Sequence, residues 1–554
     1  MSRWEPARPP WWSLPLVFAL SLALLCGLIA GLHNVHILTS NGLYKSLEAA
    51  PWIADPATAR LDPSNYLYFP LQGVLVRLLD ALGIDRGVPW RQFAWVNAAW
   101  ASLAVAIVYG FLWRLTGDGR AAAAGALFHL GCGFVLLLGV INEDIMAGYT
   151  LVLGAMALAG LWFDRPTAPR VVAVAVLFTL GWLIEWRLIF PTLPALLLAL
   201  LLSPGSLRRR AALMSLLLVA LVATAGLVQQ LWEGHPGAVG LHDLLWTGKG
   251  VNTGWAGLGW DKAWMMLSGV GNYFLLVGGW VDPLSARRAA APLVLSVVVQ
   301  GVLLLSAIVL LWPRRGEPRL RAVAAVFLGT LGAGEVFNLY SQPQDPQMQV
   351  NVLPALAVAW ALLVAEARRR GRGLGLLLLA LSVVPLAWNG AALARFRGGD
   401  RAALAALAAL EQRLPPESTV FVYWGFEPIV TWQYALWSQH WDWDGKVEIA
   451  PAPSAAPRFK WIALDAGAIR HPDWTAAHNA EVLQRDIDRA LDRGYRVVIS
   501  DVWTWSREEL ARQLGALSAA GRADAIYAML HERYEASPVL ADGFAGNYYE
   551  LRRR

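Results

Sequence analysis

Repeated long runs of apolar residues constrain this chain more than any other feature. A membrane-spanning helix needs about 20 predominantly apolar residues. Soluble domains carry about a quarter charged residues, whereas this 554-residue chain is 57% hydrophobic and 16% charged. The sequence therefore predicts an α-helical polytopic membrane protein with about eleven transmembrane helices, near residues 12–32, 92–113, 121–141, 145–163, 171–185, 188–203, 211–231, 291–312, 320–340, 350–367 and 373–393.

Arginine-bearing connections between these segments alternate with connections that lack an arginine cluster. Cytoplasmic loops of membrane proteins carry an excess of Lys and Arg, so the alternation predicts a cytoplasmic N-terminus and outer loops that include 33–91, 232–290 and 341–349. The first segment is predicted to be a retained helix rather than a cleaved signal peptide. The net charge of +6 then reflects topology and does not indicate nucleic-acid binding. The basic connections are Arg114 to Arg120, Arg165 to Arg170, Arg208 to Arg210, Arg314 to Arg321 and Arg368 to Arg372.

The composition changes near Gly398, where charges become more frequent and long apolar runs stop. Short β-rich runs alternate with helical patterns, which is typical of a small α/β layer with a mainly parallel sheet. We therefore expect a transmembrane domain over 1–395 and a soluble domain over 396–554. The helix count places the second domain outside the cytoplasm. The strand candidates are STVFVYW, FKWIALD and YRVVISDVW, and AGNYYELRRR is a candidate final strand.

Charged residues enter even the shortest turns of the predicted outer face. Glu143 and Asp144 lie between two apolar segments, and Glu185 and Arg187 lie between the next two. At an outer turn these groups are expected to reach water and avoid the cost of a charge at the bilayer centre. A functional site at the outer membrane boundary would explain the pattern.

Each candidate also has a structural explanation. Acidic residues at 143 and 144 suit a helix N-terminus, where they meet the positive end of the helix dipole. Arg187 suits an interfacial ion pair or a side chain that extends to water. His33 and His36 favour a polar loop role, because two imidazoles at this spacing do not make a metal site. The sequence predicts no metal-ligand set.

Several stretches together resemble the GT-C superfamily of polytopic glycosyltransferases. They are NYLYFPLQGVLVRLLDALG in the first outer loop, then INEDIMAGYTLVLGAMALAG, LFTLGWLIEWRLIFPTLPALLL and QDPQMQVNVLPALAV. The similarity covers roughly residues 12–395. It is greatest to the bacterial branch related to protein O-mannosyltransferases and aminoarabinose transferases.

The resemblance implies an enzyme that takes a sugar from a polyprenyl-phosphate carrier at the outer face of the membrane. It implies a catalytic carboxylate at the start of the fourth helix, where Glu143 and Asp144 match, and Glu48, Asp55 and Asp62 are the other candidate bases. The resemblance leaves open whether a divalent cation is needed for the reaction. One departure stands out, because family members carry an acidic residue soon after the first helix and this chain has His33-Asn34-Val35-His36 there. The candidate substrate-binding residues are Arg187, Glu185, His33, His36, Tyr66, Tyr68, Asp345 and Gln347.

The sequence thus predicts a glycosyltransferase of a bacterial inner membrane that acts on a lipid, glycan or protein acceptor at the periplasmic face. Two alternatives remain. A non-catalytic assembly or scaffold protein would fit the departure after the first helix. A lipid-linked-saccharide transporter would need polar or broken helices near the bilayer midplane, and few are evident.

Overall fold

A computed structural model gives the fold of the chain. It divides into two compact units, each described by itself: Met1–Leu32, Ala57–Leu75 and Phe93–Arg397 form one, and His33–Pro56, Val76–Gln92 and Gly398–Arg554 form the other. The structure describes residues 8–32, 49–63, 65–85, 89–246, 261–276, 290–340, 350–395, 405, 409, 412–423, 439–441, 447–449, 460–464, 473–514, 521–543 and 546–554.

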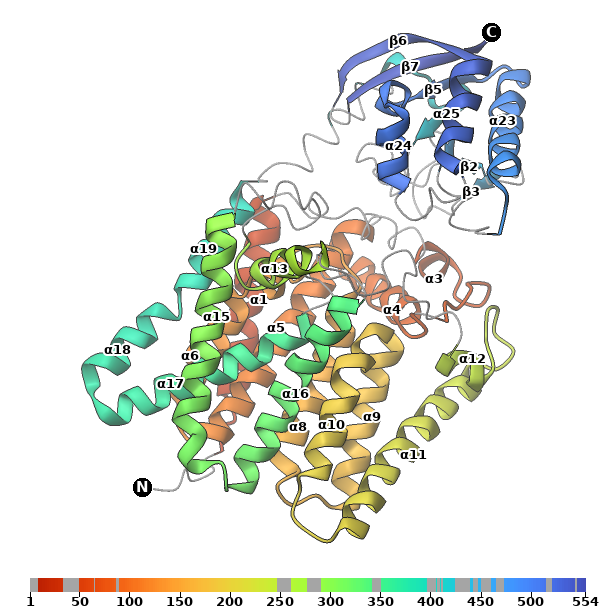
Figure 1. Ribbon diagram of the computed structural model, residues 1–554. Helices are drawn as coiled ribbons and strands as arrows, with labels where there is room; N and C mark the ends of the chain where they lie inside the picture. Colours follow the sequence, from red (N-terminus) through yellow and green to blue (C-terminus); the bar gives the residue numbers. More distant parts are fainter. Residues whose placement is uncertain are drawn as a thin grey trace. The chain divides into compact units, whose positions relative to one another are not determined.

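Apolar helices dominate the chain up to residue 394 (Figure 1). Within the described residues, eight helices are long and apolar enough to cross a membrane, and two further apolar helices, α9 and α10, are shorter. The helical elements are α1 (Ser13–Leu32), α3 (Ala50–Ala54), α4 (Tyr68–Ala81), α5 (Pro89–Thr116), α6 (Gly119–Gly131), α7 (Gly133–Leu138), α8 (Ile145–Trp162), α9 (Ala168–Ile184), η1 (Trp186–Leu188), α10 (Ile189–Leu201), α11 (Leu207–Leu231), α12 (Leu241–Trp246), α13 (Asp261–Phe274), α15 (Ala290–Leu311), η2 (Trp312–Arg314), α16 (Pro318–Tyr340), α17 (Leu353–Arg370), α18 (Arg372–Leu381) and α19 (Val384–Ala394).

The prediction of one continuous helix over 121–141 is wrong. The chain leaves the helical conformation at Cys132, with φ −58° and ψ 135°, and this residue separates α6 from α7. The side chain of Asn389 satisfies backbone groups beside the break: its Nδ2 donates to the carbonyl oxygens of Gly131 (2.6 Å) and Phe274 (3.0 Å), and its Oδ1 accepts from the Leu276 N–H. A broken helix is tolerated at membrane depth when neighbouring side chains satisfy the freed groups.

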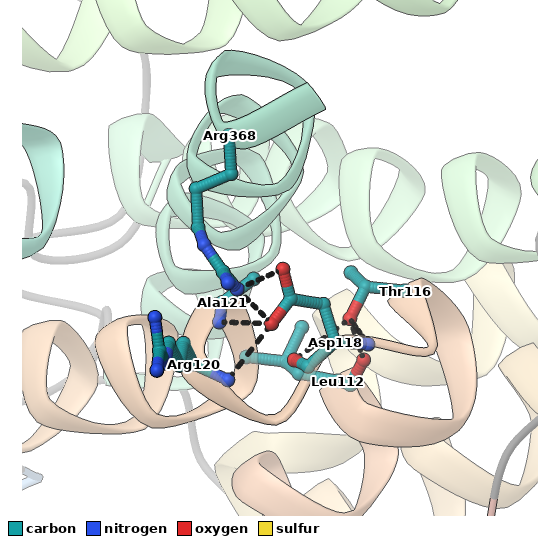
Figure 2. Close-up of polar contacts among 6 residues, drawn as sticks. All are labelled: Leu112, Thr116, Asp118, Arg120, Ala121 and Arg368. Atoms are coloured by element: carbon teal, nitrogen blue, oxygen red, sulfur yellow. Dashed lines mark hydrogen bonds and ion pairs between the residues drawn. The ribbon is translucent and has the colours of Figure 1, made fainter. Parts of the chain in front are cut away.

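An ion pair joins two of the predicted cytoplasmic connections (Figure 2). The Asp118 carboxylate accepts hydrogen bonds from the backbone N–H groups of Arg120 (2.9 Å) and Ala121 (3.3 Å), so it caps the first turn of α6. Both oxygens of the same carboxylate also accept from the guanidinium of Arg368, near the end of α17. Residues 250 positions apart in the sequence therefore fix the same end of the helical unit.

The other basic connections are also joined to one another. The Arg319 guanidinium donates to the carbonyl oxygen of Arg114 (2.6 Å), and that of Arg209 donates to the carbonyl oxygen of Pro166 (2.8 Å). Each contact links two segments that the positive-inside rule assigns to the same side of the membrane. The sequence-based topology is therefore compatible with these contacts.

The second unit contains a five-stranded mixed sheet in the order β4-β1-β5-β7-β6. β1 lies between β4 and β5 and is parallel to both, whereas β7 pairs antiparallel with β5 and with β6. The prediction of a mainly parallel sheet thus holds for only three strands, because the final two form an antiparallel hairpin. The strands are β1 (Thr419–Tyr423), β4 (Lys460–Ala463), β5 (Arg496–Ile499), β6 (Tyr534–Gly543) and β7 (Gly546–Arg553), with a separate pair β2 (Gln439–Trp441) and β3 (Val447–Ile449).

Helices α23 (Ala476–Asp492), α24 (Arg507–Leu514) and α25 (Arg522–Arg533) accompany this sheet. Their apolar residues join the inward side chains of β1 and β5 in one buried core, which contains Val420, Leu483, Val497 and Ile526. This core fits the change in composition after residue 398, because a helix that packs on one side of a sheet buries only one of its faces.

Candidate functional site

Helices α8 and α9 meet through two glycines. A methyl group built on Gly148 would lie 2.8 Å from the Gly181 carbonyl oxygen, and one built on Gly181 would lie 2.8 Å from the Gly148 carbonyl oxygen. Small residues at matching positions allow membrane helices to approach closely. The Cβ of Glu185 lies 2.9 Å from the same methyl position on Gly148. The contact therefore brings the end of α9 against the beginning of α8.

Replacing Gly148 by alanine is expected to destabilise the protein by about 1–3 kcal/mol, the usual cost of overpacking. The added methyl would push the Gly181 backbone and the Glu185 side chain away from α8. Thermal unfolding of the detergent-purified protein measures the change. Gly332→Ala is the matched control, because nothing lies within 4 Å of its added methyl. An equal melting temperature for Gly148→Ala and wild type would contradict the described contact.

Glu185 holds the guanidinium of Arg187 in one orientation. The Arg187 Nε donates to Glu185 Oε1 (2.5 Å) and Nη2 donates to Oε2 (2.9 Å), a bidentate pair. The Arg187 backbone N–H also donates to Glu185 Oε1 (3.2 Å), so this carboxylate caps the short η1 turn. The Glu185 side chain is only 1% exposed, whereas that of Arg187 is 23% exposed. The arginine is thus held by a buried acid while part of it remains accessible.

Asp144 contacts the same guanidinium from α8. Its Oδ1 lies 3.7 Å from Arg187 Nη2, although 43 residues separate the two in sequence. Asp144 occupies the N-cap position of α8, but its side chain makes no capping hydrogen bond. An interaction with the helix dipole therefore explains why an acid lies at this position. It does not explain the direction of the Asp144 carboxylate, which points toward Arg187.

The expectation that Glu143 and Asp144 reach water is wrong. Glu143 is 0% exposed and Asp144 is 1% exposed. Glu143 Oε2 accepts a hydrogen bond from the Asp144 N–H (3.2 Å), and the amide of Asn97 on α5 donates to the carbonyl oxygens of Glu143 (2.6 Å) and Ile141 (2.8 Å). Buried charges are retained when they are paired and hydrogen-bonded, and Arg187 with these polar contacts provides that environment.

The predicted first outer loop is attached to the end of α9. The Leu67 N–H donates to the Leu183 carbonyl oxygen (2.9 Å), and the neighbouring Tyr66 and Tyr68 are fully buried. The Tyr66 hydroxyl has no hydrogen-bond partner among the described residues. Burial raises the pKa of the Tyr66 phenol, so the hydroxyl stays protonated and able to donate a hydrogen bond.

Asp62 lies beside a different contact of the same loop. The neighbouring Leu61 N–H donates to the Pro236 carbonyl oxygen (2.9 Å), which attaches this part of the loop to the segment after α11. Four predicted binding residues, His33, His36, Asp345 and Gln347, lie outside the described residues.

The C-terminal part of α16 adds a buried carboxylate that sequence reasoning missed. Within the described residues, neither oxygen of Glu335 accepts a hydrogen bond of standard geometry, and the side chain interacts with Tyr273 on α13. An ionisable residue inside a predicted membrane span is itself a functional-site signal, and this signal was available for Glu335 within 320–340.

Further buried polar groups lie on the elements that meet near Glu335. A methyl built on Gly334 would lie 2.7 Å from Val352 and 3.3 Å from Pro191, so α16, the start of α17 and α10 converge there. Phe337 stacks on Phe190 at 4.5 Å, three residues from Arg187 in the chain. Buried polar atoms normally have partners, and the following side chains have none in the described part of the chain: Thr192, Asn338 and Asn351.

Acidic, histidine and cysteine residues do not form a group of three with metal-site geometry among the described residues. The charged groups that the structure brings together at the site are carboxylates and one guanidinium. Such a set can bind an anionic group at Arg187 and accept a proton at a carboxylate.

No family model matches this chain, and no curated protein matches its sequence. Solved structures do match its fold. The chain is similar to ArnT, an aminoarabinose transferase, from Cupriavidus metallidurans in the apo state, with a TM-score of 0.56, 16% identity and 97% of each chain covered. The same ArnT bound to undecaprenyl phosphate matches with a TM-score of 0.54, 14% identity and 98% of each chain covered.

An oligosaccharyltransferase from Archaeoglobus fulgidus, solved in complex with zinc and sulfate, also matches. The TM-score is 0.54 with 14% identity, and the match covers 96% of this chain and 72% of that one. ArnT and the oligosaccharyltransferase are GT-C superfamily members. The chain therefore has the GT-C fold, as its sequence pattern predicts, with a small C-terminal sheet.

Proposed function

We propose that the protein is a membrane glycosyltransferase that moves a sugar from a polyprenyl phosphate or diphosphate carrier to an acceptor at the outer face of a bacterial inner membrane. The observation that carries the proposal is the contact of Asp144 with the Glu185–Arg187 pair, which brings two separate turns of the fold together. The ArnT neighbour was crystallised with undecaprenyl phosphate, which supports a polyprenyl-linked donor.

In this proposal an acceptor hydroxyl oxygen attacks the anomeric carbon as the bond between that carbon and the phosphate oxygen breaks. The acceptor proton passes to a carboxylate, assigned to Asp144. The phosphate leaves with an additional negative charge, which the guanidinium of Arg187 stabilises. A positioned donor is most effective where charge develops in the transition state, and Glu185 fixes the direction of that donor.

The departure after the first helix fits the same assignment. Because His33-Asn34-Val35-His36 offers no carboxylate, the base must come from elsewhere in the chain. We assign it to Asp144, which contacts Arg187 from a different turn, while Glu185 is occupied in the bidentate pair with the same guanidinium. The zinc in the oligosaccharyltransferase belongs to that protein. The mechanism proposed for this chain uses the fixed charge of Arg187 for the leaving group.

A deletion strain tests the proposal. Mass spectrometry of its lipid extract should show one polyprenyl-linked sugar accumulating while one envelope component loses that sugar. Wild-type protein should restore both, and the double variant Arg187→Gln/Glu185→Gln should restore neither although it is made at normal level. An unchanged lipid-linked pool together with loss of a protein complex would instead favour the scaffold alternative. Loss of sugar transfer with the saccharide retained on the inner leaflet would favour a transporter.

We assign Glu335 to the same site as a group that holds a polar part of the substrate. Glu335→Leu is expected to raise stability by about 1–3 kcal/mol, because a buried acceptor without a standard hydrogen bond is costly. The same change should lower transfer about tenfold, equivalent to about 1.4 kcal/mol of lost binding. Melting temperature and initial transfer rate measure the two effects.

Glu233→Leu, at an exposed acid after α11, is the matched control for Glu335→Leu and should leave transfer unchanged. A Glu335→Leu protein that is more stable and fully active would show that this carboxyl has no part in the reaction.

A further inference from the structure

An apolar groove lies between α15, α16 and α17, with a volume of about 180 Å³. Apolar side chains line nearly all of it, among them Ala307, Phe327, Leu328 and Ala359. Such a lining suits a hydrocarbon chain and offers little to a sugar or a nucleotide, since these need several polar contacts.

Basic and aromatic residues lie at one end of the groove, where α15 connects to α16. Arg315, Arg321 and Trp312 all line it. The Arg315 guanidinium lies 4.8 Å from the centre of the Trp312 ring and donates to the Trp312 carbonyl oxygen (3.0 Å). These contacts hold Arg315 beside the groove rather than extended away from it.

The nearby acid is engaged by another arginine. Glu317 accepts a bidentate pair from Arg314, at 2.7 and 2.9 Å. Within the described ranges, neither Arg315 nor Arg321 forms an ion pair with a carboxylate. The groove thus ends in two positive charges that a phosphate group would complement.

This basic end is distant from the proposed reaction site. Phe190 stacks on Phe337, and Ala195 lies against Gly329, so α10 and α16 run antiparallel and Arg187 is level with the end of α16. Arg321 lies 16 residues before Phe337 on the same helix, a rise of about 24 Å. A phosphate bound at Arg321 therefore cannot be the leaving group at Arg187.

We propose that the groove binds one anionic phospholipid, with an acyl chain between α15, α16 and α17 and its phosphate at Arg315 and Arg321. Basic pockets between membrane helices on the cytoplasmic side bind anionic head groups, and an interfacial tryptophan suits the same depth. The site is independent of the glycosyl transfer proposed above. It would be occupied in the membrane whether or not a donor is bound.

Native mass spectrometry of the full-length protein, with phosphatidylglycerol or phosphatidylcholine added at equal concentration, tests this site. Wild type should retain phosphatidylglycerol in preference to phosphatidylcholine. The double variant Arg315→Gln/Arg321→Gln should bind phosphatidylglycerol about 25-fold more weakly, because each arginine near an anionic lipid contributes about fivefold. Ala324→Phe, which fills the groove, should also reduce retention while both arginines remain.

Arg120→Gln/Arg208→Gln removes the same charge from two exposed arginines that do not line the groove and should leave retention unchanged. Equal loss in this control would attribute binding to general positive charge and overturn the site. Unchanged retention in Ala324→Phe would overturn the acyl-chain assignment. Stronger retention of polyprenyl phosphate than of phosphatidylglycerol at the same concentration would overturn the choice of lipid. Melting temperatures identify any variant that fails to fold.

Discussion

Replacing Arg187 by glutamine is expected to lower glycosyl transfer by about 100- to 1000-fold, the effect of losing one preorganised donor to a developing negative charge. The change removes the only side chain shown to contact both Asp144 and Glu185 within the described part of the site. It should reduce the rate of the chemical step more than donor binding, since the leaving phosphate gains charge only as the bond breaks. Initial rates at saturating donor measure the loss.

The single variant also leaves Glu185 buried without its ion-pair partner, which by itself destabilises a protein by about 3–5 kcal/mol. The double variant Arg187→Gln/Glu185→Gln separates the two effects, because it replaces the charged pair by two neutral amides. It should recover most of the melting temperature and none of the activity. Recovery of both would mean that the arginine is structural.

Two further arginine variants sharpen this test. Arg187→Lys keeps the charge but cannot form the bidentate pair with Glu185, so transfer should remain well below wild type. Arg170→Gln, at the other end of α9, removes one positive charge from the same helix and should leave transfer unchanged. A low rate in Arg170→Gln would indicate that the assay reports helix stability rather than phosphate binding.

Replacing Asp144 by asparagine is expected to have the second large effect. The rate of glycosyl transfer should fall by about 100- to 10,000-fold, which is the usual contribution of a general base. Asparagine has nearly the same shape and is an equally good N-cap residue, so α8 should begin at the same place and the protein should fold. The comparison isolates the charge and proton affinity of the carboxylate. Rates measured with one donor and one acceptor at fixed pH give the loss.

Glu143→Gln is the matched variant, because both residues are buried acids in one turn. Glu143 accepts a hydrogen bond from the Asp144 N–H, and the Asp144 carboxylate lies 3.7 Å from the Arg187 guanidinium. We expect Glu143→Gln to reduce transfer much less than Asp144→Asn. A larger loss of activity in Glu143→Gln than in Asp144→Asn would reassign the base to Glu143. Full activity in both variants would mean that the two acids serve only to stabilise the N-terminus of α8.

The fold was largely predictable because its main determinants can be read directly along the sequence. A span requires a certain length of apolar sequence, and the arginine-bearing connections between spans follow the positive-inside rule. The contacts of Arg368 with Asp118 and of Arg209 with Pro166 involve segments that this rule places on one side.

The features that the sequence did not predict depend on packing in three dimensions. Gly131 and Gly133 flank Cys132 inside an apolar run, and backbone groups beside the break between α6 and α7 are satisfied by Asn389, which is more than 250 residues away. The burial of Glu143 and Asp144 likewise depends on how α5 and α9 cover their turn, a fact that hydropathy does not contain. The antiparallel hairpin of β6 and β7 requires strand pairing that a pattern of alternating elements does not specify.

The contact between Gly148 and Gly181 restricts how such an enzyme can diversify. Any side chain at either position would separate the two helices that carry Asp144 and Arg187, so selection would act there on packing and on chemistry at once. Mutations that alter substrate preference should therefore accumulate on the surrounding elements, such as the outer part of α16, while these two positions stay without a side chain. A library randomised at both glycines should yield few active clones, whatever donor is used for selection.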